Sequence, residues 1–138
     1  MKNSLYFILT LLITSCSQTL KNTSVSGTIK GLQKGTLYLQ QVVDSEFVTL
    51  DSLVMNSTTD FELRCDLEEA EMLFLSLSKD LNAKRISFFA DKGLTKINTT
   101  LKRFKYDAQI EGGVQQELLE TYYKNIGRFK DQKLELIE

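Results

Sequence analysis

The chain has 138 residues, of which 42% are hydrophobic and 25% charged, and its formal net charge is −1. These values predict about one globular domain, and the scattered Lys and Arg residues argue against a nucleic-acid-binding protein, which needs a basic stripe. Histidine is absent, so the commonest general base and metal ligand is missing, which disfavours a hydrolase or a metal enzyme.

The N-terminus has the composition of a secretion signal. Lys2 supplies a positive charge, and residues 5–13 are almost wholly apolar. As a helix this run would extend roughly 14 Å, whereas a bilayer core needs about 30 Å. The run is therefore too short to span a membrane and fits the apolar part of a signal peptide.

The run ends in the sequence ITSC, whose last residue is Cys16. An aliphatic residue, two small residues and a cysteine resemble a bacterial lipobox. The resemblance implies a signal peptide over residues 1–15, diacylglycerol on the Cys16 sulfur, and a lipidated tether over residues 16–23. Several acyl chains on one residue anchor stably where a single chain does not. Ser17 is not the Asp that retains lipoproteins at the inner membrane, which predicts the periplasmic side of the outer membrane. A plain signal peptide with an incidental cysteine is the alternative.

From residue 24 onward, apolar and polar residues alternate with period two, which predicts strands bounded by polar or glycine-containing turns. The predicted strands cover residues 24–31, 36–42, 47–55, 60–67, 72–78, 85–91, 94–101 and 106–112. Their spacing of about 8–12 residues predicts an antiparallel β-sandwich or a barrel-like domain over residues 24–112. The turn at residues 33–35 predicts a hairpin between the first two strands, and the turn at Lys92 and Gly93 predicts another.

After Gly113 the apolar period becomes helical. Val114, Leu118, Tyr122 and Ile126 follow one another at four-residue spacing. The sequence therefore predicts a C-terminal α-helix over residues 113–138, which Gly127 weakens in the middle. The predicted fold class is mainly β with one terminal helix.

Four segments together indicate a family. They are VSGTIKGLQKGTLYLQ from residue 25, LDS from residue 50, RISFFADKG from residue 85 and EGGVQQELLETYYK from residue 111. In this order, behind a lipobox, they resemble the family catalogued as domain of unknown function 4369, over residues 24–124. The resemblance implies a small β-rich domain of secreted lipoproteins, without known catalytic residues, that often precedes a thioredoxin-like domain in thiol–disulfide oxidoreductases.

This chain departs from the family pattern in two places. NSTT at residues 56–59 stands where the family usually has a glycine-containing turn. These 138 residues also hold no thioredoxin-like region and no C-x-x-C pair. The resemblance therefore implies a thioredoxin-like envelope partner or a truncated ancestry, and no oxidoreductase activity.

The second cysteine and the acidic turn are the remaining candidates for chemistry. Cys65 shares a strand face with Phe61 and Leu63, which predicts a small buried hydrophobic residue and not a reactive thiol. Glu68, Glu69 and Glu71 fit a solvated turn better than paired carboxylates, and no calcium-loop motif is present. We predict no catalytic residue, no metal and no cofactor.

Two further motifs have alternative interpretations. Asp51-Ser52-Leu53 resembles an O-glycosylation signal of periplasmic and outer-membrane proteins in one group of Gram-negative bacteria, which would place a glycan on Ser52. The alternative is that Asp51 and Ser52 serve the fold. Adjacent Phe88 and Phe89 must lie on opposite sheet faces, which predicts one core ring and one that is either covered or free for contact.

The sequence therefore predicts an outer-membrane-anchored periplasmic lipoprotein that acts as a binding or scaffolding module without catalysis of its own. Its predicted partners are the membrane, through the lipid anchor, and an envelope protein, which could be thioredoxin-like; nucleic acid is not expected. The alternative is an accessory or truncated N-terminal module of a thiol–disulfide oxidoreductase system.

Overall fold

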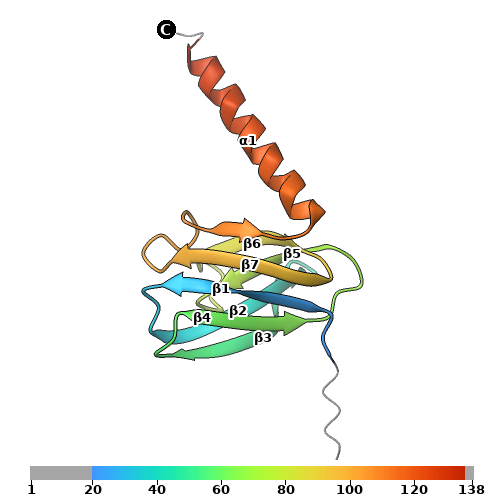
Figure 1. The fold of residues 1–138 in the computed structure, drawn as a ribbon, viewed down its shortest axis with the longest axis vertical. Coiled ribbons are helices and arrows are strands. Elements are labelled where there is room, and N and C mark those ends of the chain that lie inside the picture. Colours follow the sequence, from blue (N-terminus) through green and yellow to red (C-terminus); the bar gives the residue numbers. More distant parts are fainter. Residues whose placement is uncertain (1–19, 136–138) are drawn as a thin grey trace, which may run out of the picture.

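The computed structural model describes residues 20–135, with side-chain surroundings to residue 128. Two four-stranded sheets form a sandwich, and one helix follows them (Figure 1). The predicted fold class, a mainly β sandwich with a C-terminal helix, is confirmed. The predicted signal peptide and Cys16 lie outside the described residues.

The first sheet has the strand order β4-β1-β7-β8. Its members are β1 (Thr23–Lys30), β4 (Asp60–Cys65), β7 (Gly93–Thr100) and β8 (Gln109–Glu111). β1 pairs antiparallel with β4 and parallel with β7, so the sheet is not antiparallel throughout. The parallel pair joins the first strand of the sandwich, β1, to the seventh, β7.

Gly27 makes the close approach of β1 and β7 feasible. A Cβ atom at this position would lie 1.8 Å from the carbonyl oxygen of Ile97, and the Gly27 φ of 156° is one that L side chains rarely adopt. Only glycine fits both conditions. The glycine in SGTIK is therefore a requirement of strand pairing inside the sheet.

The second sheet has the order β3-β2-β5-β6 and is antiparallel throughout. Its members are β2 (Lys34–Val43), β3 (Glu46–Asn56), β5 (Glu71–Ser76) and β6 (Arg85–Ala90). The pairing of β2 with β3 shifts register between Leu39 and Gln40. Such a β-bulge bends the strand and increases its twist.

Both predicted hairpins are wrong. β1 and β2 lie in different sheets, and so do β6 and β7. The turns at residues 33–35 and 92–93 reverse the chain, but they carry it from one sheet to the other. Alternation specifies which face of a strand is buried, and it is the same whichever sheet the strand joins.

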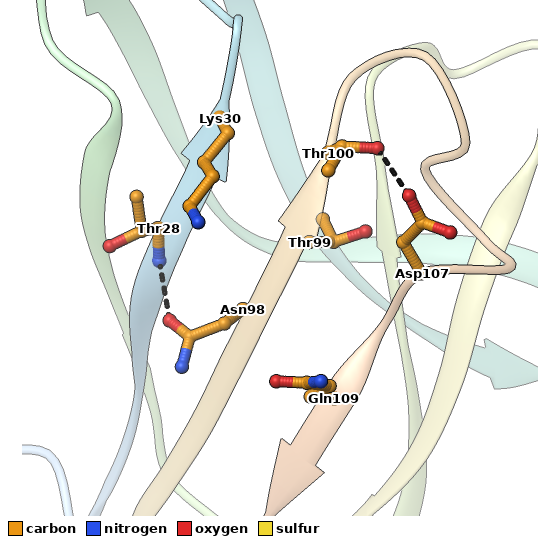
Figure 2. A pocket seen from close by; sticks show the side chains of 7 residues that line it. All are labelled: Thr28, Lys30, Asn98, Thr99, Thr100, Asp107 and Gln109. Carbon is orange, nitrogen blue, oxygen red and sulfur yellow. Dashed lines mark hydrogen bonds between the residues drawn. The ribbon is translucent and has the colours of Figure 1, made fainter.

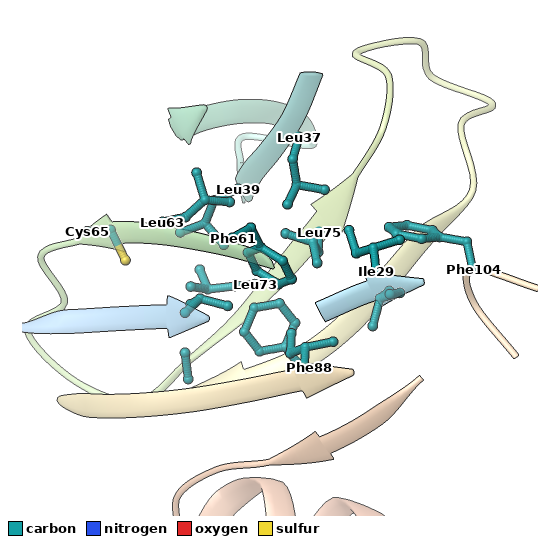
Figure 3. Packing of buried hydrophobic residues seen from close by; sticks show 14 of the residues in the cluster. Ile29, Leu37, Leu39, Phe61, Leu63, Cys65, Leu73, Leu75, Phe88 and Phe104 are labelled. Atoms are coloured by element: carbon teal, nitrogen blue, oxygen red, sulfur yellow. The ribbon is translucent and has the colours of Figure 1, made fainter. Parts of the chain in front are cut away.

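The core lies between the two inner faces. Leu37, Leu39, Leu73 and Leu75 are fully buried there, whereas Leu77 is only partly buried. Figure 3 shows these leucines packed with side chains of both sheets, namely Ile29, Phe61, Leu63, Cys65 and Phe88, and with Phe104 from the β7–β8 connection. The predicted burial of Cys65 is confirmed, and of the two adjacent phenylalanines Phe88 is the core ring while Phe89 is half-buried on the outer face.

The predicted C-terminal helix is confirmed as α1 (Val114–Glu135). Its 22 residues extend about 33 Å, and Gly127 does not end it. The helix contacts β6 and β8, and the rest of it stands out from the sandwich (Figure 1). Within residues 20–135, no helix is both long enough and apolar enough to cross a membrane.

Candidate functional site

Asp51 and Ser52 lie on β3, at one edge of the second sheet. The Asp51 carboxylate accepts two backbone hydrogen bonds, from the N–H of Ser52 at 2.9 Å and from the N–H of Arg64 on β4 at 2.8 Å. Asp51 therefore joins the edges of the two sheets, which gives it a role in the fold. The side chain of Ser52 is exposed.

Cys65 does not have the properties of a reactive thiol. Its side chain is 3% exposed, and burial raises the pKa of the thiol to about 11. The thiolate is the nucleophile in disulfide exchange, and almost none forms at neutral pH when the pKa is so high. Cys65 therefore acts as a buried apolar side chain.

The acidic turn does not form a metal site. Glu68 and Glu69 are exposed, whereas Glu71 is half-buried and accepts a hydrogen bond from the Gln41 amide. Across residues 20–135, no group of three or more His, Cys, Asp and Glu side chains could hold a metal ion.

A polar hollow of about 490 Å³ lies over β1, β7 and the segment leading into β8 (Figure 2). Two of its polar pairs bond to each other: the Thr28 N–H donates to Asn98 at 3.2 Å, and the Thr100 hydroxyl donates to Asp107 at 2.8 Å. These groups already have partners, so the hollow offers a weak basis for recognition.

Each side of the sandwich is bounded by one edge strand from each sheet, and the contacts of these edge strands differ between the two sides. At the closed side, β3 and β4 are joined by Asp51, and the Arg64 carbonyl accepts a bond from the Lys21 ammonium at 2.9 Å. At the open side, the edge strands are β6 and β8, and two hollows lie along them.

The first hollow on the open side has a volume of about 370 Å³ and aromatic walls. It is lined by Phe47, Phe74, Asn82, Ala83, Lys84, Arg85, Ser87, Lys105 and Tyr106. The second measures about 490 Å³ and lies between α1 and β8. It is lined by Ser87, Ala108, Gln109, Ile110, Glu111, Gln116, Leu119, Glu120 and Tyr123. Because both include Ser87, they form one surface, which we call the β6 groove.

The main chain of Ser87 faces the β6 groove. β6 has only one neighbour in its sheet, β5, and the N–H of Phe89 points the other way, donating to the Gln116 side chain at 2.9 Å. Residues two apart in a strand present their backbone groups to the same side. The N–H and C=O of Ser87 therefore point away from β5, as those of Phe89 do.

Arg85 organises the first hollow. Its guanidinium donates to Gln40 Oε1 at 3.1 Å and to three carbonyls of the β5–β6 connection, those of Asp80, Leu81 and Ala83. The group also stacks on the Phe47 ring, 3.8 Å from the ring centroid. All four acceptors are neutral oxygens, so these bonds hold the connection in place without cancelling the positive charge.

The β6 groove is electrostatically polar along its length. The first hollow carries Arg85 with the exposed Lys84 and Lys105, whereas the second carries the exposed carboxylates of Glu111 and Glu120. An exposed aromatic side chain, Tyr106, stands at the basic end with 76% of its surface accessible. This arrangement suits an extended segment with charges of both signs and an apolar side chain.

The β6 groove was not predicted from the sequence. Arg85 looked like one more polar residue of an alternating strand, and Gln116 like an ordinary residue of a first helical turn. Both are buried, Gln116 to 3% exposure, and each hydrogen-bonds to a residue far away in the chain: Arg85 donates to the Gln40 side chain, and Gln116 accepts from the Phe89 N–H.

Comparison with known proteins gives one match. A family model described as a domain of unknown function, DUF4369, matches residues 23–119, which span all eight strands and the start of α1. No curated protein and no solved structure matches the chain significantly.

Proposed function

The chain belongs to the DUF4369 family, and on this premise we propose that it is a lipid-anchored binding or scaffolding module of the Gram-negative cell envelope, without catalysis of its own. The proposed location is the periplasmic side of the outer membrane. The family description names no activity, so the proposal is argued from the residues of this chain.

The lipobox-like sequence before Cys16 supports the anchor. Strand β1 begins at Thr23, seven residues later, and seven extended residues span at most about 25 Å. A lipid on Cys16 would therefore keep the sandwich close to the membrane surface, where it could meet other envelope proteins.

The β6 groove is the observation that carries the binding proposal. The two hollows meet at Ser87 of the edge strand β6. The N–H and C=O of this residue point away from β5, which is the neighbour of β6 in the sheet. An extended segment can add to such an edge by main-chain hydrogen bonds, while neighbouring pockets take its side chains. We therefore propose that the partner is an envelope protein with an exposed extended segment.

The absence of catalysis in this proposal is supported by Cys65. Its burial and raised pKa leave no reactive thiol among residues 20–135, so thiol–disulfide exchange would need a second protein. A thioredoxin-like protein bound in the groove would make this chain an accessory part of a thiol–disulfide system, which is the alternative function.

The anchor is tested by fractionating cells that express Cys16→Ser, with Cys65→Ala as the matched control. We expect Cys16→Ser to leave the membrane fraction and to lack acyl mass, and Cys65→Ala to remain there. Full membrane retention of Cys16→Ser with unchanged mass would contradict the anchor.

The groove is tested by cross-linking intact cells and capturing the tagged chain. Ser87→Pro removes the N–H that faces the groove and leaves the hydrogen bonds to β5 intact. We expect the captured partner to be lost with Ser87→Pro and kept with Ser52→Ala, an exposed change on the opposite side. Equal capture by both variants, with unchanged thermal melts, would exclude the groove.

A further inference from the structure

One face of α1 is apolar and uncovered by the described part of the chain. Val114, Leu118 and Tyr122 are 69%, 60% and 58% exposed. At 100° per residue they lie within an arc of about 80°. The helix residues that line the β6 groove are Gln116, Leu119, Glu120 and Tyr123, which lie outside this arc, at about 140–240° from Val114. The exposed stripe is thus separate from the groove.

The charges of α1 are arranged in two halves. Glu117 and Glu120 precede Tyr122, and Lys124 and Arg128 follow it; all four are exposed. Around the helix, Glu117 and Arg128 lie within about 20° of each other, at one border of the apolar stripe. The same border is therefore acidic near the sandwich and basic farther along the helix.

We propose that the apolar stripe of α1 binds the same stripe of a second copy of this chain, with the two helices antiparallel and Tyr122 near the two-fold axis. An antiparallel arrangement places Glu117 of each copy beside Arg128 of the other. A parallel two-fold pair would put this border of the two helices on opposite sides of the interface, so Glu117 of one copy and Arg128 of the other would not meet. A two-fold axis makes the surface complementary to itself, as is usual in homodimers.

The shape of the chain permits this pairing. Because α1 stands out from the sandwich, an antiparallel pair would put the two sandwiches at opposite ends of the helix pair (Figure 1). With the axis at Tyr122, Leu118 of one copy faces Ile126 of the other. Two helices alone form an interface at the small end of the range, below about 1,200 Å². The dimer should therefore dissociate at micromolar concentration.

This inference does not rest on the proposed groove. The stripe and the groove lie on different faces of α1, so either can fail without the other. If both hold, a dimer presents two β6 grooves, one at each end of the helix pair.

Disulfide trapping in the full chain tests the arrangement. We expect Tyr122→Cys to give a disulfide-linked dimer on mild oxidation, and Glu117→Cys combined with Arg128→Cys to do the same. Glu117→Cys alone should stay monomeric, because its two copies would be about 15 Å apart along the helices. Lys96→Cys, exposed on the first sheet, and the unmodified chain are the controls.

Charge exchange supplies a second measurement, made by sedimentation of the purified full chain in detergent. Glu117→Arg or Arg128→Glu should weaken the dimer about tenfold, because each change turns two exposed pairs from attractive to repulsive. The double exchange should restore the wild-type dissociation constant within about threefold. A merely structural effect on the helix would not be rescued in this way.

Three results would overturn the proposal. One is a chain that stays monomeric up to about 100 μM. Another is a disulfide dimer of Glu117→Cys alone, which the antiparallel pair centred on Tyr122 does not allow. The third is trapping of Tyr122→Cys with other proteins and never with itself.

Discussion

The closed and the open sides of the sandwich use their strand edges differently. At the closed side, the N–H of Arg64 donates to Asp51 and its carbonyl accepts from Lys21, so the main chain of this β4 residue has protein partners. At the open side, the Gln116 side chain covers the N–H of Phe89, and Ser87, two residues earlier, faces the groove. An exposed strand edge is a template for pairing with another chain. This difference is the reason for proposing that recognition takes place at the open side.

An alternative explanation of the hollows on the open side is that β6 is poorly packed against the core. Substitution of Phe88 tests this alternative. This ring is fully buried on the inner face of β6. Phe88→Ala should lower the free energy of unfolding by about 3–5 kcal/mol, measured by urea denaturation. Phe89→Ala, on the half-buried outer face of β6, is the control and should cost clearly less. Similar small costs for both would mean that β6 is not firmly seated in the core.

The alkylation rate of Cys65, the last residue of β4, tests how well the closed side is buried. A pKa raised from 9.0 to about 11 leaves roughly a hundredfold less thiolate at neutral pH. Alkylation of the native chain at pH 7.5 should therefore be at least about a hundredfold slower than that of the urea-unfolded chain.

The same shift gives the sign of a pH effect. The native state holds the Cys65 proton more tightly than the unfolded state, so its contribution to stability is complete below pH 9 and declines between pH 9 and about 11. Cys65→Ala should remove that part of the decline. A native chain whose Cys65 reacts as fast as the unfolded one would contradict the burial.

Substitution of Asp51 tests the contact between β3 and β4 at the closed side. Asp51→Ala removes the acceptor of the Arg64 and Ser52 N–H groups and should cost about 1–3 kcal/mol. Ser52→Ala, at the neighbouring exposed position, should stay within about 0.5 kcal/mol. Equal thermal melts for the two variants would show that the Asp51 bridge does not hold the sheets together.

Gln116 is the counterpart of Asp51 on the open side. Gln116→Ala removes the acceptor of the Phe89 N–H, but water can enter the groove and replace it. We expect a cost of about 1 kcal/mol and faster hydrogen exchange at Phe89. A cost above that of Asp51→Ala would mean that the open side is the more tightly closed of the two.

Much of the fold could be predicted from the sequence, because its causes are local. Alternation of apolar and polar residues predicted the strand at residues 36–42, and four-residue spacing from Val114 predicted α1. The division of strands between the sheets could not be predicted, because it depends on pairings such as that of β1 with β7, whose paired residues are 70 apart in the chain.

The groove was unpredictable for the same reason. Its residues come from separate segments, with Phe47 at the start of β3, Ser87 within β6 and Tyr106 in the connection to β8. None of these residues belongs to a motif, and only the fold brings them together. The Asp51-Ser52 motif, by contrast, was visible in the sequence, and the structure gives its aspartate a role in joining the sheets.

The most direct measurement of the central claim compares contact on the two sides in living cells. A photoreactive amino acid is placed at Tyr106 on the open side or at Ser52 on the closed side; both positions are exposed, so neither change disturbs the core. We expect adducts with an envelope protein from position 106, lost when Ser87→Pro is added, and few or none from position 52. Equal adducts from both positions, or adducts from position 52 alone, would contradict the assignment of recognition to the open side.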